Sequence, residues 1–343
     1  MSKSTGICFV FALYRYKWTA AIQLFGLGPS FDYFLKFQFK QRATDMQQVQ
    51  TKRGVLSYRT YGDPHMPPLV LLMGLGMPAV AWPYEFLERL VRKGLYVITP
   101  DNRDSGASAI FTEEVSMAKM LGAIAKYVAG ASVTAQYRLE DMAADVEELL
   151  NVLGIERAHI AGISMGGMIA QVFATQAPHR TISLTCISSA TGNPRTGLGN
   201  LKAVYAVLQP PKAFDDESLR KYYRDMMQSI GTKGSDYPDA LLNEIIAVNK
   251  KNNVPQMAQA RQLMAILASG DRRQQLRQLM VPTLVIHGRA DPLLPFRAGK
   301  EISECIEGSK LHPIDIMGHD LPMNKLDEIA EAIAEHCYSG VLR

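Results

Sequence analysis

Short, nearly continuous apolar runs alternate with segments of helical apolar spacing, and this alternation constrains the fold more than any other feature of the sequence. A hairpin is predicted first, with strands at 47–52 and 55–61 that turn at Gly54. Buried strands are then predicted by the runs PPLVLLMGLG, LYVITPD, RAHIAGIS, RTISLTCISS and MVPTLVIHG. Helices are predicted at 82–93, 141–153 and 166–177, and in PFRAGKEISECI and NKLDEIAEAIAEHCY. Strands that alternate with helices indicate an α/β protein whose parallel sheet is covered on both faces.

Two segments break this alternation and divide the chain. Residues 191–277 are helical and polar without a clear strand, and they are far longer than the usual connection of about 2–6 residues. We therefore expect an inserted helical cap at 191–277, with a core formed by 46–190 and 278–343. Residues 111–136, rich in Met and Ala, predict a smaller flap between the fourth strand and its helix.

The first 45 residues differ from the rest, because 7–42 are aromatic and basic with one acid. A transmembrane helix needs about 20 mostly apolar residues, but Arg15 and Lys17 interrupt the apolar run, and no small-residue cleavage site of a signal peptide follows it. Three interpretations of 1–45 stay open. It is an amphipathic segment on a membrane surface, a helical extension packed on the main domain, or a stretch outside the working protein, since the sequence from Met46 starts like a complete domain.

The overall charge and the cysteines exclude some function classes. The 343 residues carry a net charge of +4 without a Lys/Arg cluster that could follow a phosphate backbone, so we expect no nucleic-acid partner. The cysteines at positions 8, 186, 305 and 337 are too few for a disulfide framework and lack metal-ligand spacing, which indicates a reducing, cytoplasmic compartment. The sequence carries no signal of oligomeric state.

Ser164 lies in GISMGG, a G-x-S-x-G motif between an apolar strand and a helix. A serine hydroxyl is a weak nucleophile, so a chain that uses one must hold it exposed on a sharp turn beside a base. Such a turn needs small neighbours, which Gly162 and Gly166 supply, and Gly167 lets the helix lie close to the sheet. The motif also occurs by chance, but the strand before it and the helix after it favour a nucleophile.

A base must accompany the serine, and five histidines lie downstream of it. We expect His319, because IMGHDLP is a loop after the last strand, at the sheet edge from which a base can be aimed. The alternatives have other predicted surroundings. His179 follows a helix, His336 lies inside the last helix, His287 ends a strand as a packing residue, and His312 lies near the last strand.

Asp291, in VIHGRADPLLP, comes just after a strand and before the loop of His319. A carboxylate there can accept the imidazole N–H and fix the tautomer of the ring. The rival carboxylates are Asp320, which as the sequence neighbour of the histidine points elsewhere, and Asp315, which is predicted within the preceding strand. The alternative for Asp291 is a plain Asp-Pro turn.

An oxyanion hole needs two N–H donors beside the serine. We expect the backbone N–H of Met165, directly after the serine, and that of Leu75 in LLMGLGMP, where flanking glycines let the backbone turn. Met77 and Trp82 are candidates for the entrance of the substrate pocket.

The motifs MGLG, DNRDSGAS, GISMGG, HGRADPLLP and MGHDLP together resemble the α/β-hydrolase superfamily from about Met46 to the C-terminus. Within it, the chain looks most like the aclacinomycin-methylesterase-like carboxylesterases. The resemblance implies a mostly parallel eight-stranded sheet with helices on both faces and an inserted helical cap. It also implies that Asp101, Arg103 and Ser108 form a structural turn that braces the nucleophile. Met73 replaces a histidine that many relatives carry at that place.

Together these residues predict a serine hydrolase that cleaves small-molecule carboxylic esters through an acyl-enzyme and needs no metal or organic cofactor. The cap, rich in Met, Leu, Ala and Tyr, predicts an apolar pocket. Two alternatives stay open. The same triad could serve a thioesterase, acyltransferase or perhydrolase, and a hydrolase-like fold could be a non-catalytic receptor. The sequence does not identify the natural ester, because the shape of the cap sets it.

Overall fold

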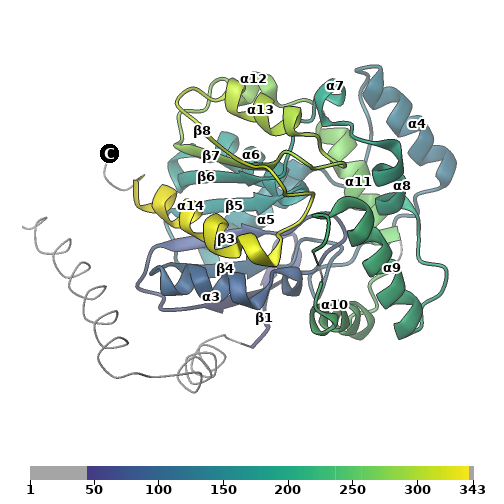
Figure 1. Cartoon of the computed structure of the whole chain (residues 1–343), viewed down its shortest axis with the longest axis horizontal. Helices are drawn as coiled ribbons and strands as arrows, with labels where there is room; N and C mark the ends of the chain where they lie inside the picture. The colour runs from purple at the N-terminus through teal and green to yellow at the C-terminus, as the bar shows by residue number, and fades with distance from the viewer. Residues whose placement is uncertain (1–44, 236, 256, 340–343) are drawn as a thin grey trace, which may run out of the picture. The chain divides into compact units, whose positions relative to one another are not determined.

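The computed structural model describes residues 45–235, 237–255 and 257–339 (Figure 1). Residues 1–44, to which the three interpretations of the N-terminal segment apply, lie outside this described part. Within the described ranges, no helix combines the length and the apolar character that crossing a bilayer requires.

An eight-stranded sheet with the order β1-β2-β4-β3-β5-β6-β7-β8 forms the centre of the fold. Its strands are β1 Gln47–Thr51, β2 Gly54–Tyr61, β3 Pro68–Leu72, β4 Tyr96–Pro100, β5 Ala158–Ile163, β6 Thr181–Ile187, β7 Thr283–Gly288 and β8 Lys310–Ile314. The pairs β1–β2 and β2–β4 are antiparallel, and the other neighbouring pairs are parallel. The mostly parallel eight-stranded sheet is therefore confirmed.

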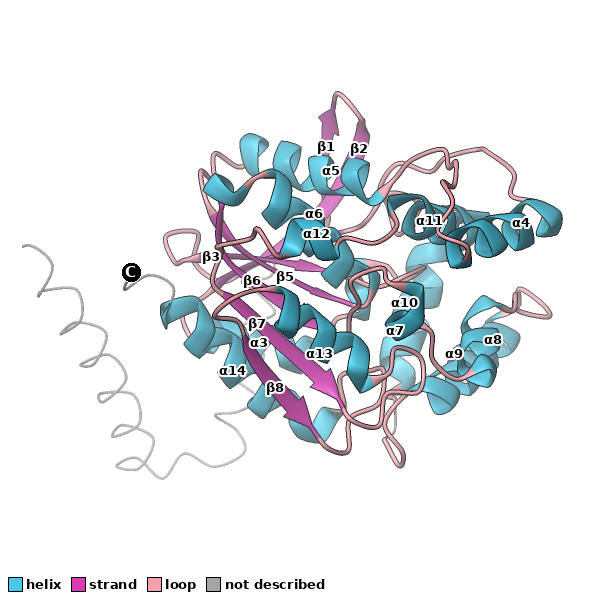
Figure 2. Cartoon of the chain, turned by 90° about the horizontal axis from the view of Figure 1, so that it is seen from above, coloured by secondary structure: helices cyan, strands magenta, loops and turns pink. Residues whose placement is uncertain are grey.

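Helices cover both faces of the sheet (Figures 1 and 2). Helices α3 (Tyr84–Arg92) and α14 (Leu326–Ser339) contact each other and the strands on one face. On the other face, α5 (Leu139–Val152), α6 (Met165–Gln176) and α13 (Phe296–Cys305) share one apolar core with the strands. Because both faces are covered, strands such as β5 and β7 are buried at every residue, which explains their unbroken apolar runs.

The connection between β6 and β7 is long and helical. Its helices are α7 Pro194–Gly197, α8 Leu201–Leu208, α9 Asp216–Ile230, α10 Asp239–Lys251, α11 Met257–Ser269 and α12 Arg273–Leu276. In both views α8 to α11 gather at one end of the sheet, together with α4 (Met117–Val128) from the predicted flap (Figures 1 and 2). Single 3₁₀ turns occur at Ala79–Ala81, Pro178–Arg180 and Met323–Lys325.

The carboxyl ends of the parallel strands define where a site can form. Strands β3, β5, β7 and β8 end at Leu72, Ile163, Gly288 and Ile314. Because they belong to the parallel part of the sheet, the loops that follow them emerge at the same edge. Ligands of open α/β sheets bind at this edge, so a site is expected among the side chains of these four loops.

Candidate active site

Ser164 lies at the end of strand β5, on the turn that leads into helix α6. Its φ of 55° and ψ of −120° place it in a backbone region that residues with a side chain rarely adopt. The surrounding structure holds this geometry, because Ser164 N donates to Ile187 O at 2.9 Å and Ser189 Oγ donates to Ser164 O at 2.8 Å. The turn leaves the serine side chain partly exposed at the sheet edge.

Glycines make this turn sterically possible. A Cβ on Gly162 would lie 2.2 Å from the carbonyl of Gly166, and a Cβ on Gly166 would lie 1.9 Å from Leu72 O. A Cβ on Gly167 would lie 2.7 Å from Ser189 Cβ. Contacts this short do not occur in proteins, so each position accepts a side chain only if the backbone moves. The steric role predicted for these glycines is confirmed.

His319 stands between Ser164 and Asp291. Its Nε2 lies 2.9 Å from Ser164 Oγ, and its Nδ1 lies 2.7 Å from Asp291 Oδ2. Because an ionised carboxylate only accepts hydrogen bonds, we assign the proton of the neutral ring to Nδ1, which leaves the Nε2 lone pair facing the serine hydroxyl. The structure thus brings together three side chains from the loops after β5, β7 and β8, which the sequence had singled out separately.

Asp291 is oriented by the turn that carries it. Its Oδ1 accepts the backbone N–H groups of Leu293 and Leu294, each at 2.9 Å. His287, in strand β7, donates through Nε2 to Leu294 O at 2.8 Å, and the same nitrogen lies 3.6 Å from Asp291 Oδ2. Burial lowers the pKa of His287, which keeps this ring neutral. Sequence reasoning gave His287 only a packing role, although its position four residues before Asp291 could have indicated the contact.

The rival carboxylates face other groups. Asp320 Oδ1 accepts hydrogen bonds from Thr232 N at 3.0 Å and Thr232 Oγ1 at 2.6 Å, and its Oδ2 accepts one from Tyr237 OH. These donors lie after α9, in the helical connection between β6 and β7, which is called the inserted segment below. Asp315 pairs with Arg289 at 2.9 Å on the surface. Its predicted place within a strand was wrong, because β8 ends one residue earlier.

The other downstream histidines have separate surroundings. His179 is exposed on the 3₁₀ turn after α6. His312 lies within β8, with Nε2 3.0 Å from Glu328 Oε1. His336 is buried in α14, where its Nε2 lies 3.2 Å from Leu184 O. His312 and His336 therefore have partners other than Ser164.

The loop of residues 73–78, called loop 73–78 below, passes beside the serine. A Cβ on Gly74 would lie 3.4 Å from Ser164 Cβ, so the loop backbone is in contact with the serine side chain. Leu75 follows in this loop and is partly buried, whereas Met165 on the other side of Ser164 is fully buried. Both residues proposed to supply backbone N–H groups therefore belong to segments that border Ser164.

The DNRDSGAS segment braces loop 73–78 and its continuation. Asn102 Nδ2 donates to Met73 O at 2.9 Å, and Asp101 Oδ1 accepts from Ala79 N at 2.7 Å. Ser108 Oγ in turn donates to Asp101 O at 2.7 Å. The segment is structural, but these bonds reach the loop after β3 and not the serine turn. The reason is topological, because the segment follows β4, the neighbour of β3.

Two buried ion pairs lie behind this segment. Arg103 binds both carboxylate oxygens of Asp145, at 2.6 and 2.7 Å, and Arg261 binds both oxygens of Asp104, at 2.7 and 2.8 Å. Tyr137 OH adds a bond to Asp104 at 2.7 Å. Removing one partner from such a pair would leave an uncompensated buried charge. Because Arg261 belongs to α11, the second pair ties the helical connection between β6 and β7 to the segment that follows β4.

Met77 and Trp82, the two predicted pocket residues, are both buried, with 8% and 2% of their surface exposed. The indole of Trp82 stacks on Phe86 of helix α3, with 5.6 Å between ring centroids. This contact places Trp82 in the packing of α3 on the sheet. The role of the two residues in a substrate pocket stays a prediction.

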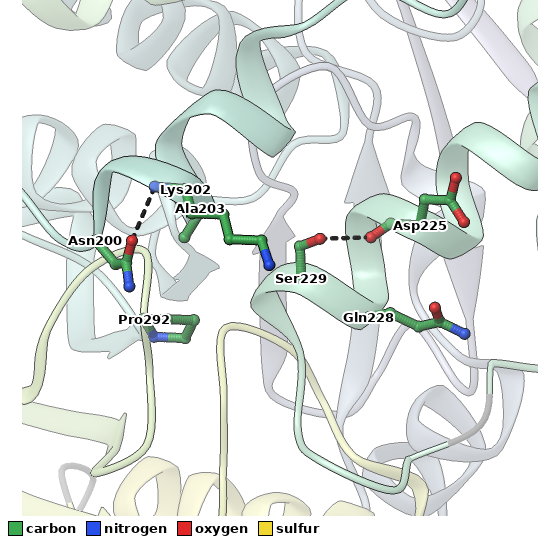
Figure 3. Close-up of a pocket in the computed structure, with 7 residues that line it drawn as sticks. All are labelled: Asn200, Lys202, Ala203, Asp225, Gln228, Ser229 and Pro292. Atoms are coloured by element: carbon green, nitrogen blue, oxygen red, sulfur yellow. Dashed lines mark hydrogen bonds between the residues drawn. The ribbon is translucent and has the colours of Figure 1, made fainter.

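A recess of about 370 Å³ lies beside the turn of Asp291. Its lining consists of Asn200, Lys202, Ala203, Asp225, Gln228, Ser229 and Pro292 (Figure 3). Helices α8 and α9 supply most of this lining, and Pro292 comes from the acid turn itself. The lining is polar and does not include the three side chains that meet at the sheet edge, so the recess is separate from the serine site.

Comparison with known proteins adds sequence and structural relatives. A family model described as alpha/beta hydrolase fold matches residues 67–325. The chain is 26% identical to rhodomycin D methylesterase DnrP of Streptomyces peucetius, a match that covers 80% of this chain and 92% of that protein. It is 25% identical to 3-oxoadipate enol-lactonase 2 of Acinetobacter baylyi, covering 81% and 90%. A solved thermophilic esterase from Thermogutta terrifontis is similar with a TM-score of 0.62 at 21% identity, covering 87% of this chain and 99% of that chain.

Proposed function

We propose that this chain, which belongs to the alpha/beta hydrolase fold family and is a carboxylic ester hydrolase, cleaves its ester with Ser164 as nucleophile, His319 as base and Asp291 as orienting acid. The family match confirms the resemblance indicated by the motifs. One observation carries the catalytic proposal. The His319 ring bridges Ser164 Oγ at 2.9 Å and Asp291 Oδ2 at 2.7 Å, within hydrogen-bond reach of both.

The reaction proceeds in two acyl-transfer steps. Ser164 Oγ attacks the ester carbonyl while its proton passes to His319 Nε2, and the resulting imidazolium is stabilised by Asp291. The tetrahedral intermediate collapses as His319 returns the proton to the departing alcohol, which leaves an ester between the acyl group and Ser164. Water then attacks this acyl-enzyme with the same histidine as base, and the carboxylic acid departs as the serine regains its proton.

The N–H groups of Leu75 and Met165 stabilise the oxyanion in this proposal. Met165 is the first residue of α6, so its N–H points out of the helix and the helix dipole adds a favourable potential. Leu75 lies in loop 73–78, whose backbone contacts the serine side chain. Removal of one oxyanion donor costs about 2.7–4 kcal/mol of transition-state stabilisation in a well-studied serine enzyme.

Residues 191–277 are proposed to act as a cap on the core formed by 46–190 and 278–343, and to shape the pocket for a small-molecule ester. Two contacts support a position of this cap over the site. Ile230 O accepts the N–H of His319 at 2.7 Å, and Thr232 Oγ1 accepts the N–H of Gly318 at 2.9 Å. The inserted segment therefore touches the loop of the proposed base directly.

Ser164→Ala tests the nucleophile. We expect this variant to lose at least about 10³-fold in kcat on p-nitrophenyl butyrate, because serine removal abolishes covalent catalysis. A fluorophosphonate probe should label the wild-type protein and not the variant. Ser303→Ala, which removes a hydroxyl from helix α13, is the matched control and should keep both activity and labelling.

Circular dichroism and a melting curve show whether Ser164→Ala is folded. A folded variant that still turns over the ester contradicts the assignment. A wild-type protein that neither labels nor turns over esters contradicts the enzyme function and favours a receptor. Product analysis with an ester or a thioester as acyl donor, and with water, an alcohol or hydrogen peroxide as acyl acceptor, separates ester hydrolysis from the other fates of the acyl group.

A further inference from the structure

The side chain of Gln262 connects helix α11 to the backbone beside the serine. Its Oε1 accepts the N–H of Gly76 at 2.7 Å, and its Nε2 donates to Arg103 O at 2.8 Å. The side chain is fully buried. One amide therefore satisfies a donor in loop 73–78 and an acceptor in the DNRDSGAS segment, although 186 residues of sequence separate it from Gly76.

The support behind Gln262 is rigid. The preceding residue, Arg261, makes the two-point ion pair with Asp104, and both side chains are almost completely buried. Arg261 also donates to Glu113 O at 3.0 Å. Two planar charged groups in this geometry allow little rotation. The pair therefore holds the turn of α11 that carries Gln262 against the segment of Asp104.

Peptide geometry passes this constraint to Leu75. The N–H of Gly76 lies in the peptide plane between Leu75 and Gly76, and the held carbonyl of Met73 lies in the plane between Met73 and Gly74. The Leu75 N–H belongs to the peptide between these two. That peptide turns about the Cα–C bond of Gly74 and the N–Cα bond of Leu75, and Gly74 has no Cβ to restrict it, so without the two anchors the Leu75 N–H could rotate away from the serine.

We propose that Gln262 is a positioning residue of the active site, which holds the Leu75 N–H toward the oxyanion by fixing the next peptide of loop 73–78. The inference rests on the proposed function, because it assumes that this N–H stabilises the oxyanion. It gives the inserted segment a second role besides shaping a pocket, since helix α11 completes the part of the site that binds developing charge.

The test compares a p-nitrophenyl ester with the matching thionoester, in which sulfur replaces the carbonyl oxygen. Donors aimed at an oxygen discriminate against sulfur, because the carbon–sulfur bond is longer and sulfur is a weaker acceptor. Gln262→Met keeps the length of the side chain and removes both hydrogen bonds. We expect kcat for the oxygen ester to fall about tenfold or more, with KM within about twofold, and the oxygen-to-sulfur rate ratio to fall by a similar factor.

Two further variants separate positioning from general damage. Gln262→Glu retains an acceptor for the Gly76 N–H and, when its carboxyl is protonated, a donor for Arg103 O, so it should recover most of the oxygen-to-sulfur ratio. Ser269→Ala also removes one accepted and one donated side-chain hydrogen bond from α11, those with Leu139 N at 2.9 Å and Glu140 Oε2 at 2.6 Å, and should leave the ratio at the wild-type value. If Gln262→Met does not fold, Gln262→Asn, polar but one methylene shorter, takes its place with the same expectation.

The outcomes are distinguishable. A wild-type protein without esterase activity or fluorophosphonate labelling overturns the proposed function. An active wild-type protein whose Gln262 variants keep the oxygen-to-sulfur ratio, even with a lowered melting temperature, overturns the positioning role alone. A ratio that falls in Gln262→Met, recovers in Gln262→Glu and is unchanged in Ser269→Ala supports it.

Discussion

Asp291→Asn tests the orienting carboxylate by changing a single heavy atom. In the native turn, Oδ1 accepts the N–H groups of Leu293 and Leu294, and Oδ2 faces His319 Nδ1. In the variant the two backbone donors hold the amide oxygen in the place of Oδ1, so the amide NH₂ must face His319. Because an NH₂ group only donates, the imidazole proton is forced onto Nε2, where it points at Ser164 and the ring cannot act as a base.

The expected loss follows from this wrong tautomer. In a serine protease with the same constellation the equivalent change lowers kcat about 10⁴-fold, and at about 1.36 kcal/mol per tenfold that is about 5 kcal/mol of activation free energy. The fold should change little, since both backbone bonds to Oδ1 survive. Initial rates on a p-nitrophenyl ester give kcat, and a thermal melt gives stability.

Asp320→Asn is the matched control for the same chemistry at the neighbouring carboxylate. Its partners are Thr232 and Tyr237, so we expect a lower melting temperature and a kcat that falls less than about tenfold. The reasoning is wrong if Asp291→Asn keeps kcat within tenfold of the wild type, or if Asp320→Asn is the more damaging of the two.

Two other predictions concern the turn of Ser164 and the stability of the protein in acid. Gly166→Ala would place a Cβ 1.9 Å from Leu72 O, so we expect urea titration to show a loss of about 1–3 kcal/mol or more, together with a large fall in kcat; unchanged values would contradict the packing argument. Burial, with smaller contributions from His336 and Arg157, lowers the pKa of His159 from 6.5 to about 4. The unfolded chain then binds the extra proton, so stability is full above pH 6.5 and decreases by about 3 kcal/mol toward pH 4. In urea titrations between pH 7 and pH 4, the free energy of unfolding of His159→Gln should fall by about 3 kcal/mol less than that of the wild type. An equal fall in both proteins would refute the attribution to His159.

Several elements could be predicted from the sequence because their signals are local. The buried strands appear as unbroken apolar runs, since helices cover both faces of the sheet, and the predicted sheet agrees with the observed one. The turn of Ser164 is equally local. The strand, the glycines and the helix that shape it lie within a few residues. Contacts inside the turn demand Gly162, whose Cβ would meet Gly166, whereas Gly166 is demanded by Leu72 O of the neighbouring strand β3.

The partners of that serine depend on longer-range geometry. Three carboxylates were candidates for His319. Only folding shows that Asp291 faces the ring, while Asp320 faces the inserted segment and Asp315 pairs with Arg289. Trp82 is buried and stacks on Phe86 of helix α3, a contact that the sequence did not predict, and its place at a pocket entrance stays a prediction.

The sequence by itself therefore determined the α/β architecture, the position of the serine turn and a short set of candidate partners. The tertiary structure alone decided which candidates meet, that His287 supports the acid turn, and that Gln262 reaches loop 73–78 across 186 residues. The physical reason is the range of the forces involved. Backbone sterics and apolar periodicity act within a few residues, whereas a side-chain hydrogen bond between distant loops exists only where the packed sheet and helices bring its two atoms within about 3 Å.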